Sequence, residues 1–154
     1  MGKVDFCNDW RFMRKDVEQV DELNVPMDDW EKVTLPHDWS VHYPVEKDNP
    51  SGSGGGFYAA GVGWYRKSFD LPELSQDEKV YIEFEGVYRC SDVWVNGNHA
   101  GFRPNGYVGF YYDITPHLRP EGNTVTVRVD NSDQPDSRWY SGSGIYRPVS
   151  LYRL

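Results

Sequence analysis

Residues 138–144 carry side chains that suit contact with a sugar. The segment reads Arg-Trp-Tyr-Ser-Gly-Ser-Gly, so a cation and two aromatic rings stand beside glycines that deny it a regular strand. Flat rings stack on the apolar faces of sugars, and Arg, Asp and Asn side chains satisfy the hydroxyls. We therefore predict that Arg138, Trp139 and Tyr140 bind substrate. The alternative is that Trp139 and Tyr140 pack under a loop as a satellite of the core.

A second candidate is the pair His37 and His42 with Asp38 between them, which raises the question of a metal site. The two histidines are five residues apart in a proline-flanked segment, which is not the i, i+4 pair of a helical zinc site, and the nearby sequence offers no third His or Cys. We prefer buried or turn hydrogen bonds for His37 and Asp38. The sequence thus predicts no metal and no cofactor.

The carboxylates form no complete active site. Glycoside hydrolysis needs two carboxyl groups about 5 to 10 Å apart, and Glu83 and Glu85 lie two residues apart on one strand face. A strand side that faces water explains them more simply. Asp130, Asp133 and Asp136 lie in a turn-like segment without the spacing of an EF-hand, so we interpret that segment as a polar turn.

These residues must be positioned by a sheet structure, because the apolar residues follow a period of two. Such alternation is typical of strands with one dry and one wet face. Asn96-Gly97 follows a β-branched run and predicts a hairpin turn. We expect an all-β fold, an antiparallel β-sandwich of the jelly-roll kind. The strongest alternation covers residues 80–84 and 124–129, and further strands are expected within 64–71, 92–95, 108–112 and 145–152.

Length and charge narrow the function classes. The chain has 154 residues and a formal net charge of −8, which predicts a single domain over residues 1–154 with a substantial core. The sequence contains no long basic cluster and no apolar run that could span a membrane, so we expect neither nucleic acid nor membrane as a partner. Aromatic residues make up 16% of the chain, a surplus that a core or a binding face must use.

Residues 48–63 are dominated by glycine and are long for a connection in a compact domain, which is typical of a functional or mobile loop. They lack the Lys-Ser/Thr ending of a phosphate-binding loop. The two cysteines, Cys7 and Cys90, are too few for a disulfide scaffold, and spacing alone leaves their pairing open.

Four segments, in order, resemble the N-terminal sugar-binding domain of glycoside hydrolase family 2, the family of β-galactosidases, β-glucuronidases and β-mannosidases. The resemblance covers nearly the whole chain. The first two segments are Leu-Pro-His-Asp-Trp at 35–39 and Gly-Trp-Tyr-Arg-Lys-Ser-Phe at 63–69. The third runs from Phe-Glu-Gly-Val at 84–87 through Val-Trp-Val-Asn-Gly at 93–97 to Asp-Ile-Thr at 113–115, and the fourth occupies 138–149.

The resemblance implies a jelly-roll domain of a larger enzyme whose two catalytic glutamates lie on a (β/α)₈ barrel outside this chain. The chain itself would be non-catalytic, and its partners would be a β-glycoside and the other domains of the parent. In the best-known galactosidases and glucuronidases an Asp that contacts the sugar occupies the slot of Arg138. Since a guanidinium only donates hydrogen bonds, that contact does not carry over. An Arg there suits an acidic or sulfated sugar, or an acid of the barrel.

Two other functions compete with this one. The chain could be an independent, lectin-like carbohydrate-binding module, or a purely structural sandwich whose aromatics pack against neighbouring domains. Residues 145–149, Ile-Tyr-Arg-Pro-Val, look like the lead-in to another domain and favour the first interpretation.

Overall fold

The computed structural model describes residues 2–15, 29–37, 61–71, 76–88, 90–104, 109–131 and 144–154. Strands dominate these residues, which confirms the all-β prediction. No helix in the described part is long and apolar enough to cross a membrane. The strands are β1 (Gly2–Asp5), β2 (Trp10–Arg14), β3 (Glu31–Val33), β4 (Val62–Phe69), β5 (Val80–Phe84), β6 (Cys90–Val95), β7 (Asn98–Arg103), β8 (Phe110–Asp113), β9 (Asn123–Asp130) and β10 (Val149–Arg153), with a short 3₁₀ turn, η5, at Thr115–His117.

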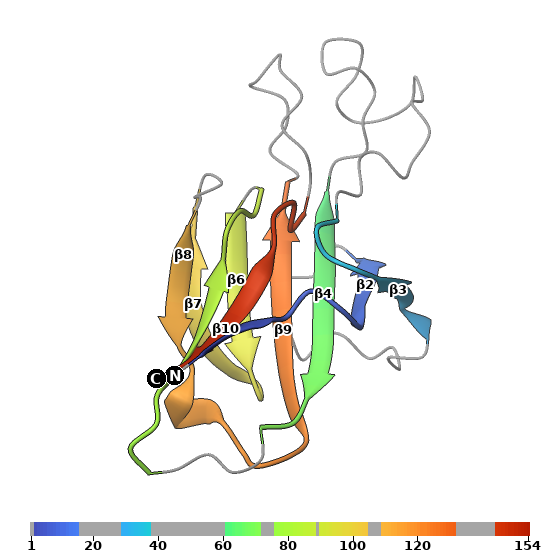
Figure 1. Cartoon of the computed structure of the whole chain (residues 1–154). Coiled ribbons are helices and arrows are strands. Elements are labelled where there is room, and N and C mark those ends of the chain that lie inside the picture. The colour runs from blue at the N-terminus through green and yellow to red at the C-terminus, as the bar shows by residue number, and fades with distance from the viewer. Residues whose placement is uncertain are drawn as a thin grey trace, which may run out of the picture.

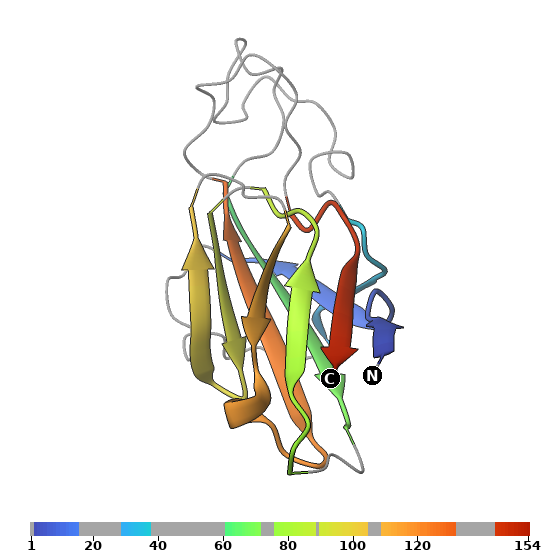
Figure 2. The same ribbon diagram turned by 60° about the vertical axis from the view of Figure 1, so that its left-hand side comes forward.

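The strands form two antiparallel sheets that pack face to face (Figures 1 and 2). One sheet has the order β1-β10-β5-β8, and the other has the order β3-β2-β4-β9-β6-β7. The first and last strands pair with each other, Gly2 opposite Arg153, so the two ends of the chain lie side by side. This arrangement confirms the predicted jelly-roll sandwich.

The period-two patterns place the core where the sequence predicts it. Along β5, Val80, Ile82 and Phe84 are fully buried, whereas the alternating Tyr81 and Glu83 lie on the outer face. In β9, the inward side chains come from Val125, Val127 and Val129, which are also fully buried. Burying a side chain of this size stabilises the fold by about 1.5–3 kcal/mol relative to exposure, so these two strands anchor the sandwich.

The expected strand at 145–152 begins later, at Val149. Upstream of it the backbone bonds to neighbouring connections: Ile145 O accepts from His37 N, and Pro148 O accepts from Glu85 N. Pro148 itself has no N–H to donate to a ladder. The strands β1 to β3 were not predicted, because β1 is exposed along its length and β3 has only three residues.

The predicted hairpin turn at Asn96-Gly97 is confirmed. Both residues have positive φ, 51° and 82°, as a type I′ turn requires. The Asn96 side chain also fastens the turn to the rest of the fold. Its amide donates to His117 O at 2.6 Å and to Asn123 Oδ1 at 3.0 Å, and its Oδ1 accepts from Thr124 N at 2.9 Å.

Gly101 allows the two sheets to approach closely. A Cβ at this position would lie 2.1 Å from Cε1 of Tyr112, so the tyrosine ring of one sheet packs directly on the backbone of the other. Asp113 closes the turn that follows β8, because its carboxylate accepts from Thr115 N at 3.0 Å. Cys7 and Cys90 are both free thiols, which settles the pairing that spacing left open.

A second hydrophobic cluster lies on the outer face of the larger sheet. It consists of Trp30, Val62, Trp64 and Trp94, with Met13 packed against it. Trp64 and Trp94 stack with centroids 5.5 Å apart, and Arg66 lies over the Trp30 ring at 5.1 Å. Part of the aromatic surplus is thus structural.

Candidate functional site

The end of β9 and the start of β4 lie at one end of the sandwich (Figure 1), and they border, through Asn131 and Gly61, the segments 132–143 and 38–60, which lie outside the described residues. Four residues form their stems: His37 and Gly61 flank the first segment, and Asn131 and Gly144 flank the second. The stems are joined in pairs. Asn131 N donates to Gly61 O at 2.7 Å, and His37 N donates to the carbonyl of Ile145, next to Gly144, also at 2.7 Å. Both segments are therefore anchored at one place.

A buried histidine and tyrosine join the stems to the core. His37 Nδ1 lies 2.7 Å from the Tyr65 hydroxyl, and both side chains are buried. Phe12 packs against the two rings at centroid distances of 4.7 and 4.9 Å. His37 thus makes the buried hydrogen bond that the sequence favours for it. Asp38 and His42 lie outside the described residues, and those that are described contain no group of three His, Cys, Asp or Glu placed to hold a metal.

Gly144 completes this anchor. It has φ +120°, and its backbone exchanges two hydrogen bonds with Tyr88, at 2.8 and 2.9 Å. A Cβ on Gly144 would lie 2.2 Å from Tyr65 Oη and 3.1 Å from His37 O. The glycine therefore lets its own backbone sit directly on the His37–Tyr65 pair.

The predicted site residues Arg138, Trp139 and Tyr140 lie outside the described residues, as do Asp133 and Asp136. Their segment starts after Asn131, which is fully buried, and ends before Gly144. Sequence patterns did not identify Tyr65 and Asn131 as anchors of the site. The nearest signal was the Leu35-Pro36-His37 segment of the first motif, which contains His37 but neither of these two residues.

Of the carboxylates discussed above, Asp130 ends β9 directly before the stem residue Asn131, whereas Glu83 and Glu85 belong to β5 and the residue that follows it. Glu83 lies on the outer face of the smaller sheet, where it accepts a hydrogen bond from Tyr152 Oη at 2.9 Å. Glu85 is half-buried just beyond the end of β5, and its backbone carbonyl accepts from Gly109 N. The part of the chain that the structure describes therefore positions two segments at one end of the sandwich and assembles no pair of carboxylates there.

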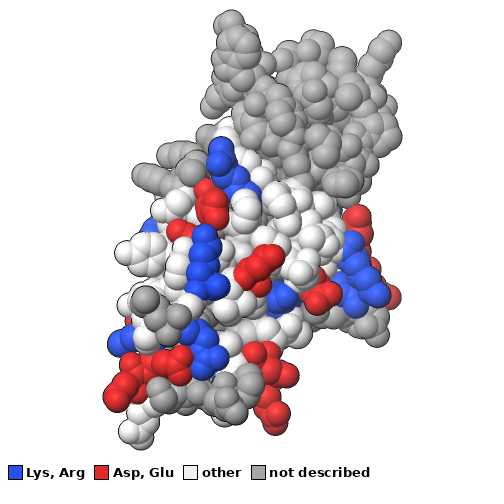
Figure 3. Space-filling view, in the orientation of Figure 1, with Lys and Arg blue, Asp and Glu red and all other residues white. Residues whose placement is uncertain are grey.

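Surface charge does not favour a polyanionic partner. On the face shown in Figure 3, Lys and Arg lie among Asp and Glu and form no continuous basic patch among the described residues. This distribution agrees with the net charge of −8, which repels polyanions at a distance.

Comparison with known proteins assigns the chain to a family. Residues 4–154 match the model of the glycosyl hydrolases family 2 sugar binding domain. A beta-galactosidase of Bacteroides ovatus is 49% identical over 150 residues, which cover 97% of this chain and 18% of that protein. A beta-glucuronidase of Formosa agariphila is 33% identical over 164 residues, covering 97% of this chain and 17% of that one.

The similarity extends to solved structures. A beta-glycosidase from Bacteroides vulgatus superposes with a TM-score of 0.90 at 40% sequence identity, over 99% of this chain and 20% of that one. The chain thus spans about a fifth or less of the length of the proteins it matches.

Proposed function

Because the chain belongs to the sugar-binding domains of glycosyl hydrolase family 2, we propose that it is a non-catalytic domain that shapes the substrate pocket of a retaining exo-β-glycosidase. The whole of residues 1–154 forms this one domain. The catalytic glutamates lie on a barrel elsewhere in the parent protein. The short span of the relatives that the chain covers supports a larger parent.

The observation that carries the proposal is the shared anchorage of segments 38–60 and 132–143. Backbone hydrogen bonds of 2.7 Å join their stems, and the buried His37–Tyr65 pair holds the stems to the core. Stems that are fixed to a rigid sandwich limit the entropy that a pocket built on them loses when substrate binds.

Within segment 132–143, we assign substrate contact to Arg138, Trp139 and Tyr140. The rings stack on the apolar face of the sugar, and the guanidinium donates to an acidic group or to hydroxyl oxygens. The names of the relatives include both beta-galactosidase and beta-glucuronidase. An Arg at this position favours the acidic sugar, because a guanidinium and a carboxylate form charge-assisted hydrogen bonds.

The test compares the isolated chain with the full-length parent on chromogenic β-glucuronides and β-galactosides. We expect no turnover by the chain alone. In the parent, Arg138→Ala lowers kcat/KM for its preferred glycoside by about tenfold or more, equivalent to about 1.4 kcal/mol. Arg119→Ala is the matched control, since Arg119 is exposed and outside these segments.

Turnover by the repurified chain that Arg138→Ala abolishes would contradict the non-catalytic role. Full kcat/KM in the Arg138→Ala and Trp139→Ala parents would instead assign the domain a purely structural role.

A further inference from the structure

The outer face of the smaller sheet has a tyrosine-lined groove that the proposed function does not use. Its lining residues are Tyr81, Glu83, Tyr111, Tyr152 and Leu154, and its volume is about 350 Å³. We call it the tyrosine groove. This volume lies in the range of about 300–1,000 Å³ that is typical of small-molecule sites.

The tyrosines come from three adjacent strands and do not serve the core. Tyr152 of β10 lies opposite Tyr81 of β5, and Tyr111 of β8 lies opposite Glu83. The intervening rows, which include Ile82 and Leu151, point inward and are buried. Tyr111 is 62% exposed, which is unusual for so large a ring.

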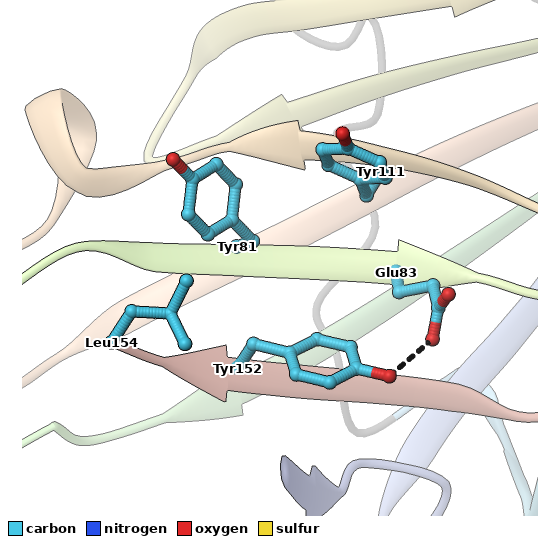
Figure 4. A pocket seen from close by; sticks show the side chains of 5 residues that line it. All are labelled: Tyr81, Glu83, Tyr111, Tyr152 and Leu154. Carbon is cyan, nitrogen blue, oxygen red and sulfur yellow. Dashed lines mark hydrogen bonds between the residues drawn. The ribbon is translucent and has the colours of Figure 1, made fainter. Parts of the chain in front are cut away.

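The groove is held in shape by its own contacts. Tyr81 and Tyr111 meet edge to face, with centroids 5.8 Å apart at 83°. The Tyr152 hydroxyl donates to Glu83 Oε1 at 2.9 Å. Figure 4 shows Tyr81 and Tyr111 along one side of β5, Tyr152 and Leu154 along the other, and Glu83 toward one end. A ligand entering it therefore finds rings already oriented, which lowers the cost of binding.

The chemistry of the groove suits a neutral sugar chain. Tyrosine rings offer flat surfaces for the C–H faces of pyranoses, and the phenol hydroxyls and the Glu83 carboxylate offer hydrogen-bond partners for their hydroxyls. The Lys3 ammonium lies beside the groove, 5.8 Å from the centroid of the Tyr152 ring, whereas Glu83, the one charged lining residue, supplies a negative charge. Asp113, opposite Tyr81, adds another nearby. These two carboxylates outnumber the one ammonium, so an acidic glycan is disfavoured relative to a neutral one.

We propose that the tyrosine groove is a second carbohydrate-binding surface, specific for neutral β-linked oligosaccharides and separate from the segments 38–60 and 132–143. It rests on the proposed function only in that the parent acts on β-glycosides. The groove would hold one part of a polymeric substrate, while the pocket formed with those segments receives the sugar that is cleaved.

The test titrates the ¹⁵N-labelled 154-residue chain with β-1,4-galactotetraose, cellotetraose and laminaritetraose and follows the backbone amide signals. We expect saturable shifts in β5, β8 and β10 with at least one of these neutral sugars. Tyr111→Ala should raise that Kd by about two- to tenfold, the range given by one lost aromatic contact. Phe102→Ala is the matched control, because Phe102 is a 47% exposed ring on β7 of the other sheet.

Charge selectivity provides a second readout. A hyaluronan tetrasaccharide, which is acidic, should not shift the groove amides of the wild-type chain, and Glu83→Gln should allow it to do so. Tyr111→Ala and Glu83→Gln alter an exposed and a half-exposed side chain, respectively. Each variant should therefore keep the amide spectrum of the folded chain, and that spectrum serves as the check on folding.

Three results would overturn the proposal. The first is that none of the three neutral sugars gives saturable shifts of the groove amides. The second is that Tyr81→Ala and Tyr111→Ala leave the Kd for the sugar unchanged. The third is that the groove binds the peptide decaproline and no sugar. Deuterium exchange of the full-length parent gives a further check. If the tetrasaccharide does not protect β8 from exchange there, the groove is assigned to a contact within the parent instead.

The two proposals fail separately. Tyr111→Ala should leave hydrolysis of a nitrophenyl monosaccharide by the parent unchanged, whereas Arg138→Ala should leave sugar binding by the groove unchanged.

Discussion

The His37 imidazole and the Tyr65 hydroxyl meet 2.7 Å apart in the interior, where the chain enters segment 38–60. His37 N also bonds to the carbonyl of Ile145 on the far side of segment 132–143. One buried pair thus holds segments that lie about a hundred positions apart in the chain. Because a buried hydrogen bond costs more to lose than an exposed one, this pair controls the geometry of that end of the sandwich.

Removal of the Tyr65 hydroxyl should destabilise the protein. We expect Tyr65→Phe to lower the free energy of unfolding by about 1–3 kcal/mol, because buried His37 loses this partner. Urea unfolding measures the change. Tyr111→Phe is the matched control and should change the value by less than about 0.5 kcal/mol, since Tyr111 is 62% exposed. Equal effects of the two substitutions would show that the buried pair does not contribute.

A side chain at Gly144 should disturb the same anchor. Gly144→Ala places a Cβ 2.2 Å from Tyr65 Oη on a backbone with φ +120°, so we expect a loss of more than about 2 kcal/mol in unfolding free energy. Gly122→Ala also places an alanine at positive φ, but at +71°, close to the left-handed region that other residues can adopt, and with nothing within 4 Å of its Cβ. Gly122→Ala should therefore lower the free energy of unfolding by less, about 1–2 kcal/mol.

Measuring kcat/KM distinguishes a local effect of Gly144→Ala on the pocket from a general loss of stability. In the parent enzyme we expect Gly144→Ala to lower kcat/KM while Gly122→Ala does not, at a temperature where both remain folded. Equal kcat/KM values in the two variants would contradict a role of the stems in shaping the pocket.

The side chain of Asn96 should contribute more to the free energy of unfolding than its position in a surface turn indicates. It makes three hydrogen bonds, to His117, Asn123 and Thr124. Asn96→Ala also places an alanine at φ 51°, so we expect a loss of about 2–4 kcal/mol in thermal or urea unfolding. The neighbouring Asn98→Ala, at an exposed position, should have an effect within about 0.5 kcal/mol.

Tyr112 should make the protein less stable in alkali. Burial raises the pKa of Tyr112 to about 12, and nearby Arg103 partly opposes that rise. Above the ordinary pKa of 10.0 the unfolded chain loses this proton while the folded chain keeps it, so stability falls as the pH rises from about 10 to 12. Tyr112→Phe should remove this part of the slope.

The same variant should be well tolerated at neutral pH. The Tyr112 hydroxyl is buried and has no hydrogen-bond partner in the described structure, so its removal loses no bond. Urea unfolding of wild type and Tyr112→Phe at pH 7 and at several values between pH 10 and 12 measures both effects. Parallel pH profiles for the two proteins would contradict the assignment.

Local chemistry made several features predictable from the sequence. The alternation in residues 80–84 and 124–129 specifies a strand and its buried side, because successive side chains in a strand point to opposite faces. Asn96-Gly97 specifies its turn, since few residue pairs tolerate two positive φ values. The four motifs alone indicate the family, and the match over residues 4–154 confirms it.

Other features depend on residues that are distant in the chain. Alternation shows that Tyr81 faces outward, yet only the register of β10, β5 and β8 brings Tyr81, Tyr111 and Tyr152 into one groove. The strands β1 to β3 escaped prediction for a related reason, because short or exposed strands are stabilised by their partners more than by their own composition. The assignment of Arg138, Trp139 and Tyr140 remains a prediction.

The sequence by itself determined the strand faces, the hairpin turn and the family, since each depends on residues close together in the chain. The tertiary structure decided which stems are joined, how the aromatic surplus divides, and where the tyrosine groove lies. The physical reason is that hydrogen bonds such as His37–Tyr65 and close contacts such as Gly144–Tyr65 depend on sheet packing, which no local pattern specifies.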